Sequence, residues 1–258
     1  KTAGAFGNVD FKVVVDAFMT DTANHADLFL PSTLMLEQED IIASYLHDYI
    51  HYVPAVLPAP GEARSDFQIF SELGKKLNPP ILLPESDSCL RFSLNSQHLN
   101  VSLESVRQQK FVRANRPMIP YENSKFDHRD GKYRFPKALH PEPPPPENYP
   151  LRLLSLIRRD VMHSQIPHEK QKGLPAAWVS PETLKKQGIE PNQQVCIVSE
   201  LGKIAVTVKP MEGIHPGSVL YRRGDWFKNG GGINRIIQAA TTDLGHGTAY
   251  YRQYVRLE

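Results

Sequence analysis

The chain has 258 residues, of which 40% are hydrophobic and 22% charged; these values are ordinary for a globular protein and exclude wholesale disorder. A formal net charge of +2 argues against a dedicated nucleic-acid-binding protein, and no apolar run approaches the ~20 residues that span a bilayer. Cys89 and Cys196 are too isolated for a disulfide framework, or for a zinc or iron–sulfur site held by this chain alone. We therefore expect neither a nucleic-acid partner nor membrane insertion.

Charge is distributed unevenly along the chain. Residues 1–150 contain 15 Lys and Arg against 19 Asp and Glu, whereas residues 151–258 contain 15 against 9. The second part is therefore net +6, which favours an anionic ligand without identifying one. The sequence also lacks an initiating methionine and a signal sequence, and it opens on an apolar strand that would normally lie inside a covered sheet. We interpret the chain as a piece of a larger protein.

The first elements form a strand–helix–strand pattern. Residues 11–15 (FKVVV) predict a buried strand that ends at Asp16, and the following TDTANHAD predicts one or two helical turns capped by Thr20 or Asp21. LFLP (28–31) predicts a second strand, and this order implies a parallel sheet. Ligands bind beyond the carboxyl ends of such strands, so the loop after the first strand is a candidate site. An ordinary capped turn explains that loop equally well.

Residues 65–77 (SDFQIFSELGKKL) predict the clearest helix. Ser65 and Gln68 form a capping box, and apolar residues recur at helical spacing, so we expect this helix to belong to the core. Residues 81–149 carry weaker patterns. The proline-rich run at 140–150 predicts a stiff, extended segment and marks a boundary.

After this boundary the pattern changes to short strands around one small helix. The helix is predicted at 180–188, with Ser180 at its N-cap, Pro181 at its first position and Gly188 beyond its end. Closely spaced, mostly antiparallel strands of this kind predict a compact β-barrel. The strands are predicted at 151–157, 195–199, 204–208, 216–221 and 249–257.

The segment 158–170 (RRDVMHSQIPHEK) contains the residues of most chemical interest. A serine hydrolase would pair Ser164 with His163 or His168. Adjacent residues on an extended chain point in opposite directions, so His163 cannot easily serve Ser164, and no GxSxG pattern is present. A metal site would need a third ligand beside the two histidines, and none stands at suitable spacing. Two interpretations remain: a solvated turn, and an anion-binding loop in which Arg158 and Arg159 bind phosphate.

The last segment offers parts that complement such a ligand. Glycines 230–232 allow a close backbone approach, and Tyr250 and Tyr251 offer faces for stacking. Further polar contacts are available from Asn234, Arg252 and Gln253. Together these features predict a ligand with phosphates and a flat, polar ring system.

With these motifs in place, the chain resembles the C-terminal third of the bis-molybdopterin guanine dinucleotide oxidoreductases, the dimethyl sulfoxide reductase superfamily. Each matching segment is loose by itself, but six in the family's order are specific. The segments are VVVDAFMTDTANHADLFLPSTLMLEQED (13–40), PGEARSDFQIFSELGKKL (60–77), DGKYRFP (130–136), RRDVMHSQI (158–166), the run from SPETLKKQGIEP to HPGSVLY (180–221) and INRIIQAATTDLGHGTAYYRQYVRLE (233–258).

The resemblance implies an α/β fragment followed by a β-barrel domain of double-psi type. Residues 1–80 would be the C-terminal piece of a Rossmann-like molybdopterin-binding domain. Residues 81–147 would be a connecting segment that includes the proline-rich linker. Residues 148–258 would be the molybdopterin dinucleotide-binding barrel.

Matched position by position, the resemblance also implies ten cofactor-binding residues. Thr20 and Thr22 match the loop that faces one dinucleotide. The contacts to a pterin or its phosphates fall on Arg159, His163, Ser164 and Gln165. The terminal segment that lines the cofactor contributes Asn234, Asp243, Tyr250 and Arg252.

By the same resemblance the chain binds bis-molybdopterin guanine dinucleotide with molybdenum or tungsten, and positions it for two-electron redox chemistry. The family's Cys motif for an iron–sulfur cluster and its segment with the protein ligand to the metal are not in this sequence. We therefore expect no catalytic residue, no metal ligand and no turnover from this chain alone. The implied partners are missing N-terminal domains and electron-transfer subunits, in a cytoplasmic or periplasmic prokaryotic protein of anaerobic respiration. A stand-alone, non-catalytic double-psi scaffold is the alternative.

Overall fold

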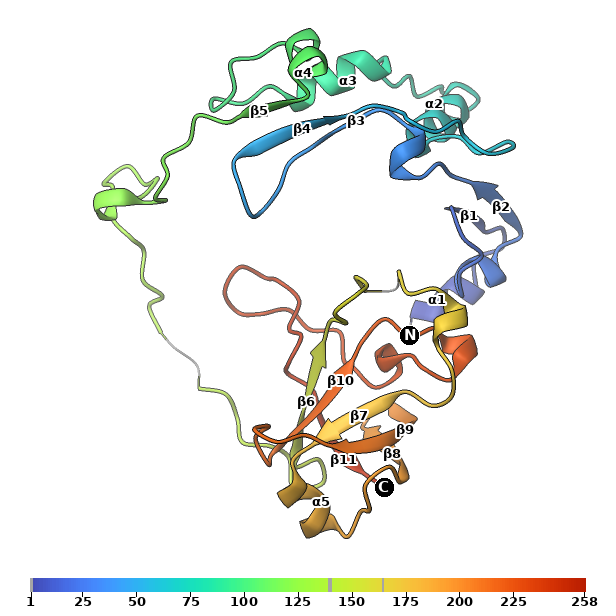
Figure 1. Cartoon of the computed structure of the whole chain (residues 1–258), viewed down its shortest axis with the longest axis vertical. Helices are drawn as coiled ribbons and strands as arrows, with labels where there is room; N and C mark the ends of the chain where they lie inside the picture. The colour runs from blue at the N-terminus through green and yellow to red at the C-terminus, as the bar shows by residue number, and fades with distance from the viewer. Residues whose placement is uncertain (1, 139–140, 164) are drawn as a thin grey trace. The chain divides into compact units, whose positions relative to one another are not determined.

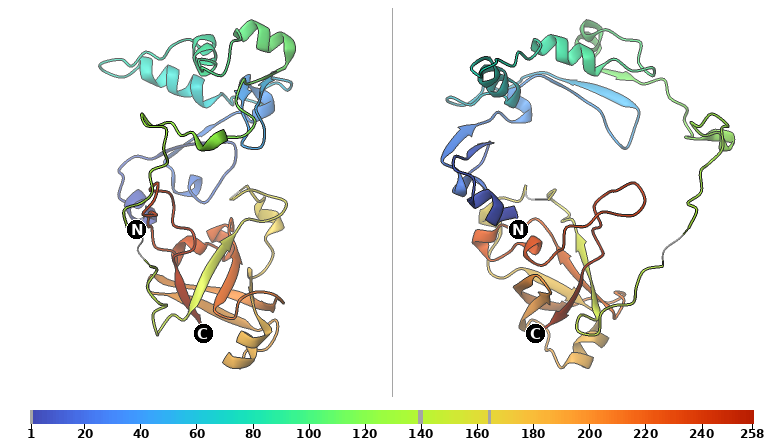
Figure 2. Two further views of the ribbon diagram at one scale, coloured as in Figure 1. Left: turned by 90° about the vertical axis from the view of Figure 1, so that its left-hand side faces the viewer. Right: turned by 180° about the vertical axis from the view of Figure 1, so that it is seen from behind.

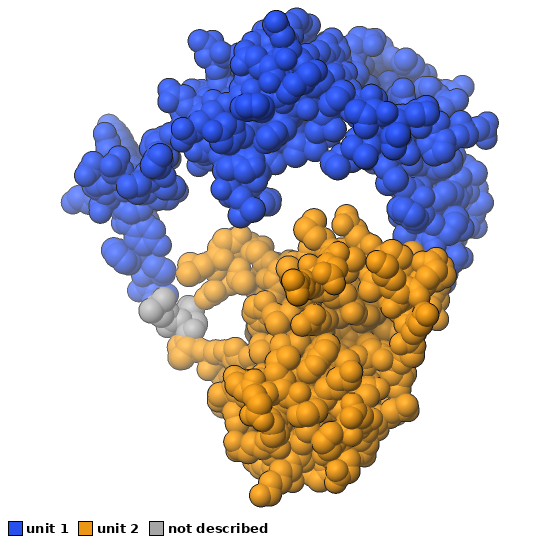
Figure 3. Space-filling view, in the orientation of Figure 1, with its two compact units in different colours: residues 1–138 blue, residues 139–258 orange. Residues whose placement is uncertain are grey.

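The computed structural model describes residues 2–138, 141–163 and 165–258. The chain divides into two compact units, unit 1 at residues 1–138 and unit 2 at residues 139–258 (Figure 3). The elements of unit 1 are α1 (Thr2–Gly7), β1 (Val13–Asp16), η1 (Ala23–His25), β2 (Leu28–Pro31), η2 (Met35–Glu37), β3 (Asp40–Ile42), β4 (Tyr49–Val53), α2 (Asp66–Lys75), α3 (Ser86–Ser93), α4 (Leu103–Gln109), β5 (Phe111–Arg113) and η3 (Glu122–Ser124) (Figure 1).

The elements of unit 2 belong to a barrel and its connections. They are β6 (Leu151–Leu156), η4 (His168–Lys170), β7 (Ala176–Val179), α5 (Pro181–Gln187), β8 (Gln194–Ser199), β9 (Gly202–Pro210), β10 (Ser218–Arg222), η5 (Phe227–Asn229), η6 (Ile233–Arg235) and β11 (Tyr254–Leu257) (Figures 1 and 2). None of the helices in the described part of the chain is long and apolar enough to cross a membrane.

The predicted parallel pair at the start of the chain is confirmed. β1 and β2 pair in parallel, with Val13 opposite Leu28 and Asp16 opposite Pro31. The connection between them is a single 3₁₀ turn, η1. The Thr20 hydroxyl accepts a hydrogen bond from the Ala23 amide at 3.3 Å, which satisfies one of the free donors at the start of that turn.

The middle of unit 1 contains more structure than its sequence pattern indicated. β3, β4 and β5 form an antiparallel sheet in that order, accompanied by α3 and α4. Leu94, Leu103 and Val106 are buried beside this sheet and form a small hydrophobic core. The strands are three to five residues long, too short to display the alternation on which strand prediction depends.

The predicted capping box of α2 is confirmed, but its predicted place in the core is wrong. The Ser65 hydroxyl accepts from the Gln68 amide at 3.2 Å, and the Gln68 side chain accepts from the Ser65 amide at 3.1 Å. Phe70 and Leu73 nevertheless stay 53% and 50% exposed. Ile81 packs closely against the helix at Gly74, since its carbonyl oxygen would lie 2.4 Å from a Cβ placed there.

Unit 2 contains the predicted barrel. Its six strands close in the order β10-β6-β11-β8-β9-β7. Most neighbouring pairs are antiparallel, as predicted, whereas β6 pairs with β10 and β7 with β9 in parallel. Strand β7 was not predicted, because AAWV is short and begins directly after the loop residues GLP.

Alternating side chains fill the barrel. Along β9, Ile204, Val206 and Val208 are buried while the residues between them are less covered, which is the period of two expected of a strand. Leu153 on β6 and Ile197 on β8 meet them from other sides and are fully buried. The hydrophobic core of unit 2 therefore lies inside the barrel.

Helix α5 and the last strand, β11, were both predicted from the sequence, with different success. Helix α5 has the predicted signals: the Ser180 hydroxyl accepts from the Thr183 amide at 3.0 Å, and Gly188 ends the helix in the left-handed conformation. The predicted closing strand from residue 249 is too long, since β11 begins only at Tyr254. Residues 250–251 form a turn instead, and the Ser155 hydroxyl of β6 donates to the Tyr250 carbonyl at 3.4 Å.

Candidate functional site

The candidate site lies where β6 and β10 end. These strands are parallel neighbours, so their carboxyl ends lie at the same end of the barrel, and the long loops that follow both strands leave from there (Figure 1). Helix α5 follows β7, which runs antiparallel to β10, and therefore lies at the opposite end. The backbone fixes the junction, because the Arg223 amide donates to the Leu156 carbonyl at 2.9 Å.

Arg223, the residue after β10, contacts residues of three different segments of the chain. Its Nη1 donates to the Ser155 carbonyl at 2.7 Å, and its Nε donates to His163 Nδ1 at 3.4 Å. Its guanidinium lies over the Tyr250 ring, 4.5 Å from the ring centre, a cation–π arrangement. We call Ser155, His163, Arg223 and Tyr250 the Arg223 cluster.

The backbone beside this cluster is held by a close approach that requires glycine. Gly224 has φ of +109°, and a Cβ at this position would lie 1.8 Å from the His163 carbonyl oxygen. His163 itself has φ of +46°, an uncommon conformation for a residue with a side chain. The sequence therefore fixes the position of His163 through Gly224 as well as through Arg223.

Arg158 forms an ion pair that the sequence did not predict. It forms an ion pair with Asp225, whose side chain is only 6% exposed, and its Nη2 donates to the Arg222 carbonyl at 3.2 Å. Asp225 also accepts a hydrogen bond from the buried Tyr221 hydroxyl, and burial together with this carboxylate raises the pKa of Tyr221 well above its usual value. Arg158 therefore neutralises a buried carboxylate through its Nη2, and a phosphate contact by this residue stays a prediction.

The structure brings only some of the sequence-predicted residues together. His163 and Tyr250 meet through Arg223, while Arg159 and Gln165 are exposed on the same loop as His163. Ser164 lies outside the described residues. The remaining residues are dispersed: Asn234 is exposed on η6, Asp243 is exposed and accepts from the Leu244 amide, Arg252 lies just before β11, and Thr20 and Thr22 follow β1 in unit 1.

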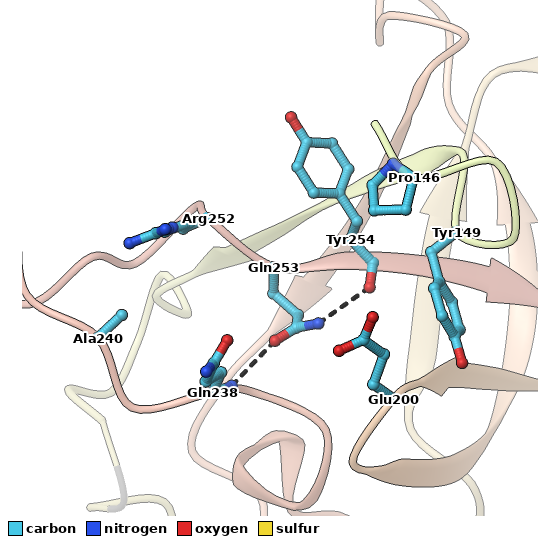
Figure 4. A pocket seen from close by; sticks show the side chains of 8 residues that line it. All are labelled: Pro146, Tyr149, Glu200, Gln238, Ala240, Arg252, Gln253 and Tyr254. Carbon is cyan, nitrogen blue, oxygen red and sulfur yellow. Dashed lines mark hydrogen bonds between the residues drawn. The ribbon is translucent and has the colours of Figure 1, made fainter. Parts of the chain in front are cut away.

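Arg252 faces a surface cavity of about 190 Å³ in unit 2 (Figure 4). Gln253 beside it is already committed, since its Oε1 accepts from the Gln238 amide at 2.9 Å and its Nε2 donates to the Tyr254 carbonyl at 3.0 Å. Its side chain is thus held in place by the backbone, and the predicted ligand contact by Gln253 stays a prediction. The residues around the cavity are Pro146, Tyr149, Glu200, Gln238, Ala240, Arg252, Gln253 and Tyr254.

The Arg223 cluster suits an anionic ligand with a flat ring system. It presents an imidazole, a guanidinium and an aromatic ring at the edge of a unit with six more basic than acidic side chains from residue 151 onward. Within the described ranges, no group of three or more His, Cys, Asp or Glu side chains could hold a metal ion. The residues of the Arg223 cluster can bind and orient a ligand of this kind.

Arg223 is the residue that sequence reasoning missed. The run YRRGDW at 221–226 contained the signal, because two arginines and a glycine follow directly after a predicted strand. The sequence-based prediction of an anion-binding loop rested instead on Arg158 and Arg159. Only the parallel pairing of β6 with β10 reveals that both arginine pairs meet at one end of the barrel.

Comparisons with known proteins agree with this geometry. A family model described as "Molydopterin dinucleotide binding domain" matches residues 156–254, from the end of β6 to the start of β11. A model described as "Molybdopterin oxidoreductase" matches residues 1–76. The chain thus belongs to the molybdopterin oxidoreductase family, in the dimethyl sulfoxide reductase superfamily, and carries its dinucleotide-binding domain.

Individual relatives are consistent with that assignment. The chain is 28% identical to a probable oxidoreductase of Bacillus subtilis, 24% identical to a putative dimethyl sulfoxide reductase catalytic subunit of Halobacterium salinarum and 27% identical to a putative formate dehydrogenase of Staphylococcus aureus. These matches cover 100%, 96% and 98% of this chain, but only 42%, 33% and 27% of the relatives. The chain therefore spans less than half of the curated relatives that it matches.

A solved structure shares the fold. Acetylene hydratase from Pelobacter acetylenicus matches 99% of this chain with a TM-score of 0.73 and 16% identity, and the match covers 41% of that enzyme. At this level of identity the likeness extends to the fold alone.

Proposed function

We propose that this chain is the C-terminal, cofactor-binding portion of a molybdenum or tungsten oxidoreductase. The proposal rests on the agreement between the bounds of the family match and the strands that flank the Arg223 cluster. The dinucleotide-binding match begins at the end of β6 and ends at the start of β11, and the whole Arg223 cluster except its Ser155 lies within that span. We further assign the barrel to the double-psi type and the β1–β2 pair to a Rossmann-like domain.

The residues present fit the implied cofactor, bis-molybdopterin guanine dinucleotide. The close approach of Gly224 to His163 leaves backbone where a Cβ would intrude, and the Arg223 cluster adds cationic and aromatic groups. These groups match a ligand that carries phosphates and fused polar rings. The basic excess of the second part of the chain, +6, would attract the phosphates of such a ligand.

Each residue assigned to the cofactor then has a role in binding or positioning it. His163 would donate a hydrogen bond to a pterin edge through its Nε2–H, because its Nδ1 accepts from Arg223. Tyr250 would lie along a ring system, since Arg223 already holds its other face. Further contacts are assigned to Thr20, Thr22, Arg159, Ser164, Gln165, Asn234, Asp243 and Arg252.

When bound, the cofactor supplies the dithiolene sulfurs that hold the metal for two-electron redox chemistry. The chain contributes orientation, electrostatic stabilisation of the phosphates and exclusion of water, which is the usual role of protein around such a cofactor. We propose that the protein ligand to the metal, any iron–sulfur cluster and the electron-transfer subunits lie outside this sequence. The chain by itself should show no turnover.

The test is equilibrium binding of molybdopterin guanine dinucleotide to the 258-residue chain. We expect saturable binding, and a dissociation constant raised about tenfold by Arg159→Ala or His163→Ala, because each removes one contact to a charged or polar edge. Lys209→Gln, at the exposed end of β9, is the matched control and should leave the constant unchanged. Absence of binding by a folded sample would instead favour a stand-alone scaffold barrel.

A further inference from the structure

The short segment that carries Arg223 is held at both ends by buried side chains. At its start, Tyr221 belongs to β10 and is fully buried in the barrel. At its end, the side chain of Asp225 is only 6% exposed, although Asp225 is not among the residues assigned to the cofactor. A carboxylate is withdrawn from water only where other groups compensate its charge, so the burial of Asp225 calls for an explanation.

Both oxygens of the Asp225 carboxylate have a partner of their own. Oδ2 accepts a hydrogen bond from the Tyr221 hydroxyl, four residues earlier, and Oδ1 forms the ion pair with Arg158 Nη2. Burial raises the pKa of Tyr221, so its hydroxyl keeps the proton that it donates. The same Nη2 of Arg158 donates to the Arg222 carbonyl at 3.2 Å. We call Arg158, Tyr221 and Asp225 the Asp225 triad, which links β10 to the loop after β6.

The residues around Asp225 confine its side chain further. Trp226, the next residue, is tied to the loop after β6, since its amide donates to Gln171 Oε1 at 2.9 Å and its Nε1 donates to the Ile166 carbonyl at 2.8 Å. A Cβ placed on Gly231 would lie 2.0 Å from Asp225 Cβ, so this close contact requires glycine. The carboxylate therefore has a fixed position between the two loops.

Arg223 and Gly224 are the residues that lie between these fixed points. Arg158 binds the backbone before them, at the Arg222 carbonyl, and the side chain after them, at Asp225. The contact of Arg223 Nε with His163 Nδ1 is long, at 3.4 Å, so a small displacement of the backbone would break it. The Asp225 triad therefore determines where Arg223 meets His163.

We propose that Asp225 is a positioning residue of the cofactor-binding site, which holds Arg223 in place through Tyr221 and Arg158 and does not contact the ligand itself. The proposal rests on the proposed function where it concerns ligand affinity, whereas the effect on Arg223 requires no ligand. Loss of a supporting contact of this kind commonly lowers affinity by about tenfold or more, because the binding group loses its orientation.

Tyr221→Phe is the first test, because the phenyl ring still fills the barrel while the hydrogen-bond donor to Asp225 is lost. In the 258-residue chain without ligand, we expect the NMR signals of Arg223 Nε–H and of the His163 imidazole to shift. We expect the dissociation constant for molybdopterin guanine dinucleotide to rise about tenfold. Unchanged signals overturn the proposal. Shifted signals with an unchanged dissociation constant, in a wild-type chain that binds, also overturn it.

A matched core variant separates positioning from stability. Val219→Ala changes a fully buried side chain of the same strand and should lower the urea midpoint by an amount similar to that of Tyr221→Phe. It should leave the Arg223 signal and the dissociation constant unchanged, because Val219 is not part of the Asp225 triad. Equal shifts of the Arg223 signal in Val219→Ala and Tyr221→Phe would reduce the triad to a stabilising role and overturn the proposal.

Asp225→Asn tests the charge of the carboxylate. The amide retains one oxygen but no longer neutralises Arg158, so the Arg223 signal should shift at least as far as in Tyr221→Phe. An unshifted Arg223 signal in a folded Asp225→Asn sample contradicts the proposal. If the wild-type chain binds no dinucleotide while Tyr221→Phe still shifts the Arg223 and His163 signals, the cofactor proposal fails and the positioning of Arg223 by Asp225 is retained.

Discussion

At the scale of single residues, the candidate site depends on contacts that span long stretches of sequence. Arg223 reaches His163, sixty residues earlier, and lies over Tyr250. His163 and Tyr250 were both implied by the family resemblance, whereas Arg223 was not. The residue that joins them is visible only when the strands are paired, because neither composition nor spacing relates position 163 to position 223.

Gly224 offers a test of the backbone beside that cluster. Gly224→Ala introduces both a strained φ and a clash with the His163 carbonyl, and should lower the free energy of unfolding by about 1–3 kcal/mol. Gly213→Ala is the control, because it has φ of +77° but nothing within 4 Å of the added Cβ. It should cost about 1 kcal/mol through strain alone. Urea unfolding measures both, and equal losses would show that the close approach is not maintained in solution.

A second residue-scale prediction concerns the arginine itself. Arg223→Lys keeps the positive charge but loses the planar fork that serves Ser155, His163 and Tyr250 at once. We expect the imidazole signals of His163 to shift and dinucleotide affinity to fall about tenfold. If neither the NMR signals nor the affinity changes, Arg223 is not a positioning residue.

At the scale of elements, prediction worked where local signals are strong. The capping box of α2, the N-cap serine of α5 and the residues that end both helices specify these helices almost to the residue, because caps satisfy backbone groups locally. The parallel β1–β2 pair followed from the strand–turn–strand order. Strands β3, β4, β5 and β7 were missed, since three to five residues carry too little periodicity. Burial of α2 could not be judged from its own sequence, because burial depends on what packs against it.

The barrel core gives the element-scale prediction. Ile197→Ala should lower the stability of unit 2 by about 2–5 kcal/mol, since this fully buried side chain fills the barrel interior. Lys203→Ala, an exposed position on the paired strand β9, should change it by less than about 0.5 kcal/mol. Tryptophan fluorescence during urea unfolding reports on this unit, because both tryptophans of the chain, Trp178 and Trp226, belong to it. Similar midpoints for the two variants would contradict the assigned core.

At the scale of the whole molecule, the two units differ in what holds them together. Unit 2 has a closed hydrophobic barrel, whereas unit 1 has a small apolar core supplemented by an ion-pair network. Arg107 in that network binds Glu39 at 2.6 Å and Asp87 at 2.6 Å. Hydrogen bonds from Arg107 lower the pKa of both carboxyl groups, and a hydrogen bond from Arg91 lowers the pKa of Glu104 to about 2.

This network predicts the acid sensitivity of unit 1. A carboxyl group whose pKa is lowered by folding stabilises the folded state above its ordinary pKa, and that contribution is lost as pH falls through the lowered value. Unit 1 should therefore weaken below the ordinary glutamate range, near pH 4.5, and Arg107→Gln should move its acid transition to higher pH. The amide signals of α4 follow that transition. Arg113→Gln, an exposed site on β5, is the control; a similar shift in both variants would refute the role of the network.

Three findings are consistent with a domain that binds an anionic cofactor: the family assignment, the barrel and the charge asymmetry. Each of them concerns a different property of the chain. Family membership follows from the matches to residues 1–76 and 156–254, and the barrel from strand pairing. The contact residues follow from neither, because binding side chains sit on loops whose positions are set by distant strands. The central claim is therefore that the carboxyl ends of β6 and β10 form the cofactor-binding end of the barrel.

The most direct measurement is a chemical-shift map of the 258-residue chain titrated with molybdopterin guanine dinucleotide. We predict the largest backbone amide shifts at His163, Arg223 and Tyr250, and none at Lys185 on α5, at the opposite end of the barrel. Saturable shifts concentrated around α5 and absent from the Arg223 cluster would contradict the account, as would the absence of any shift in a folded sample.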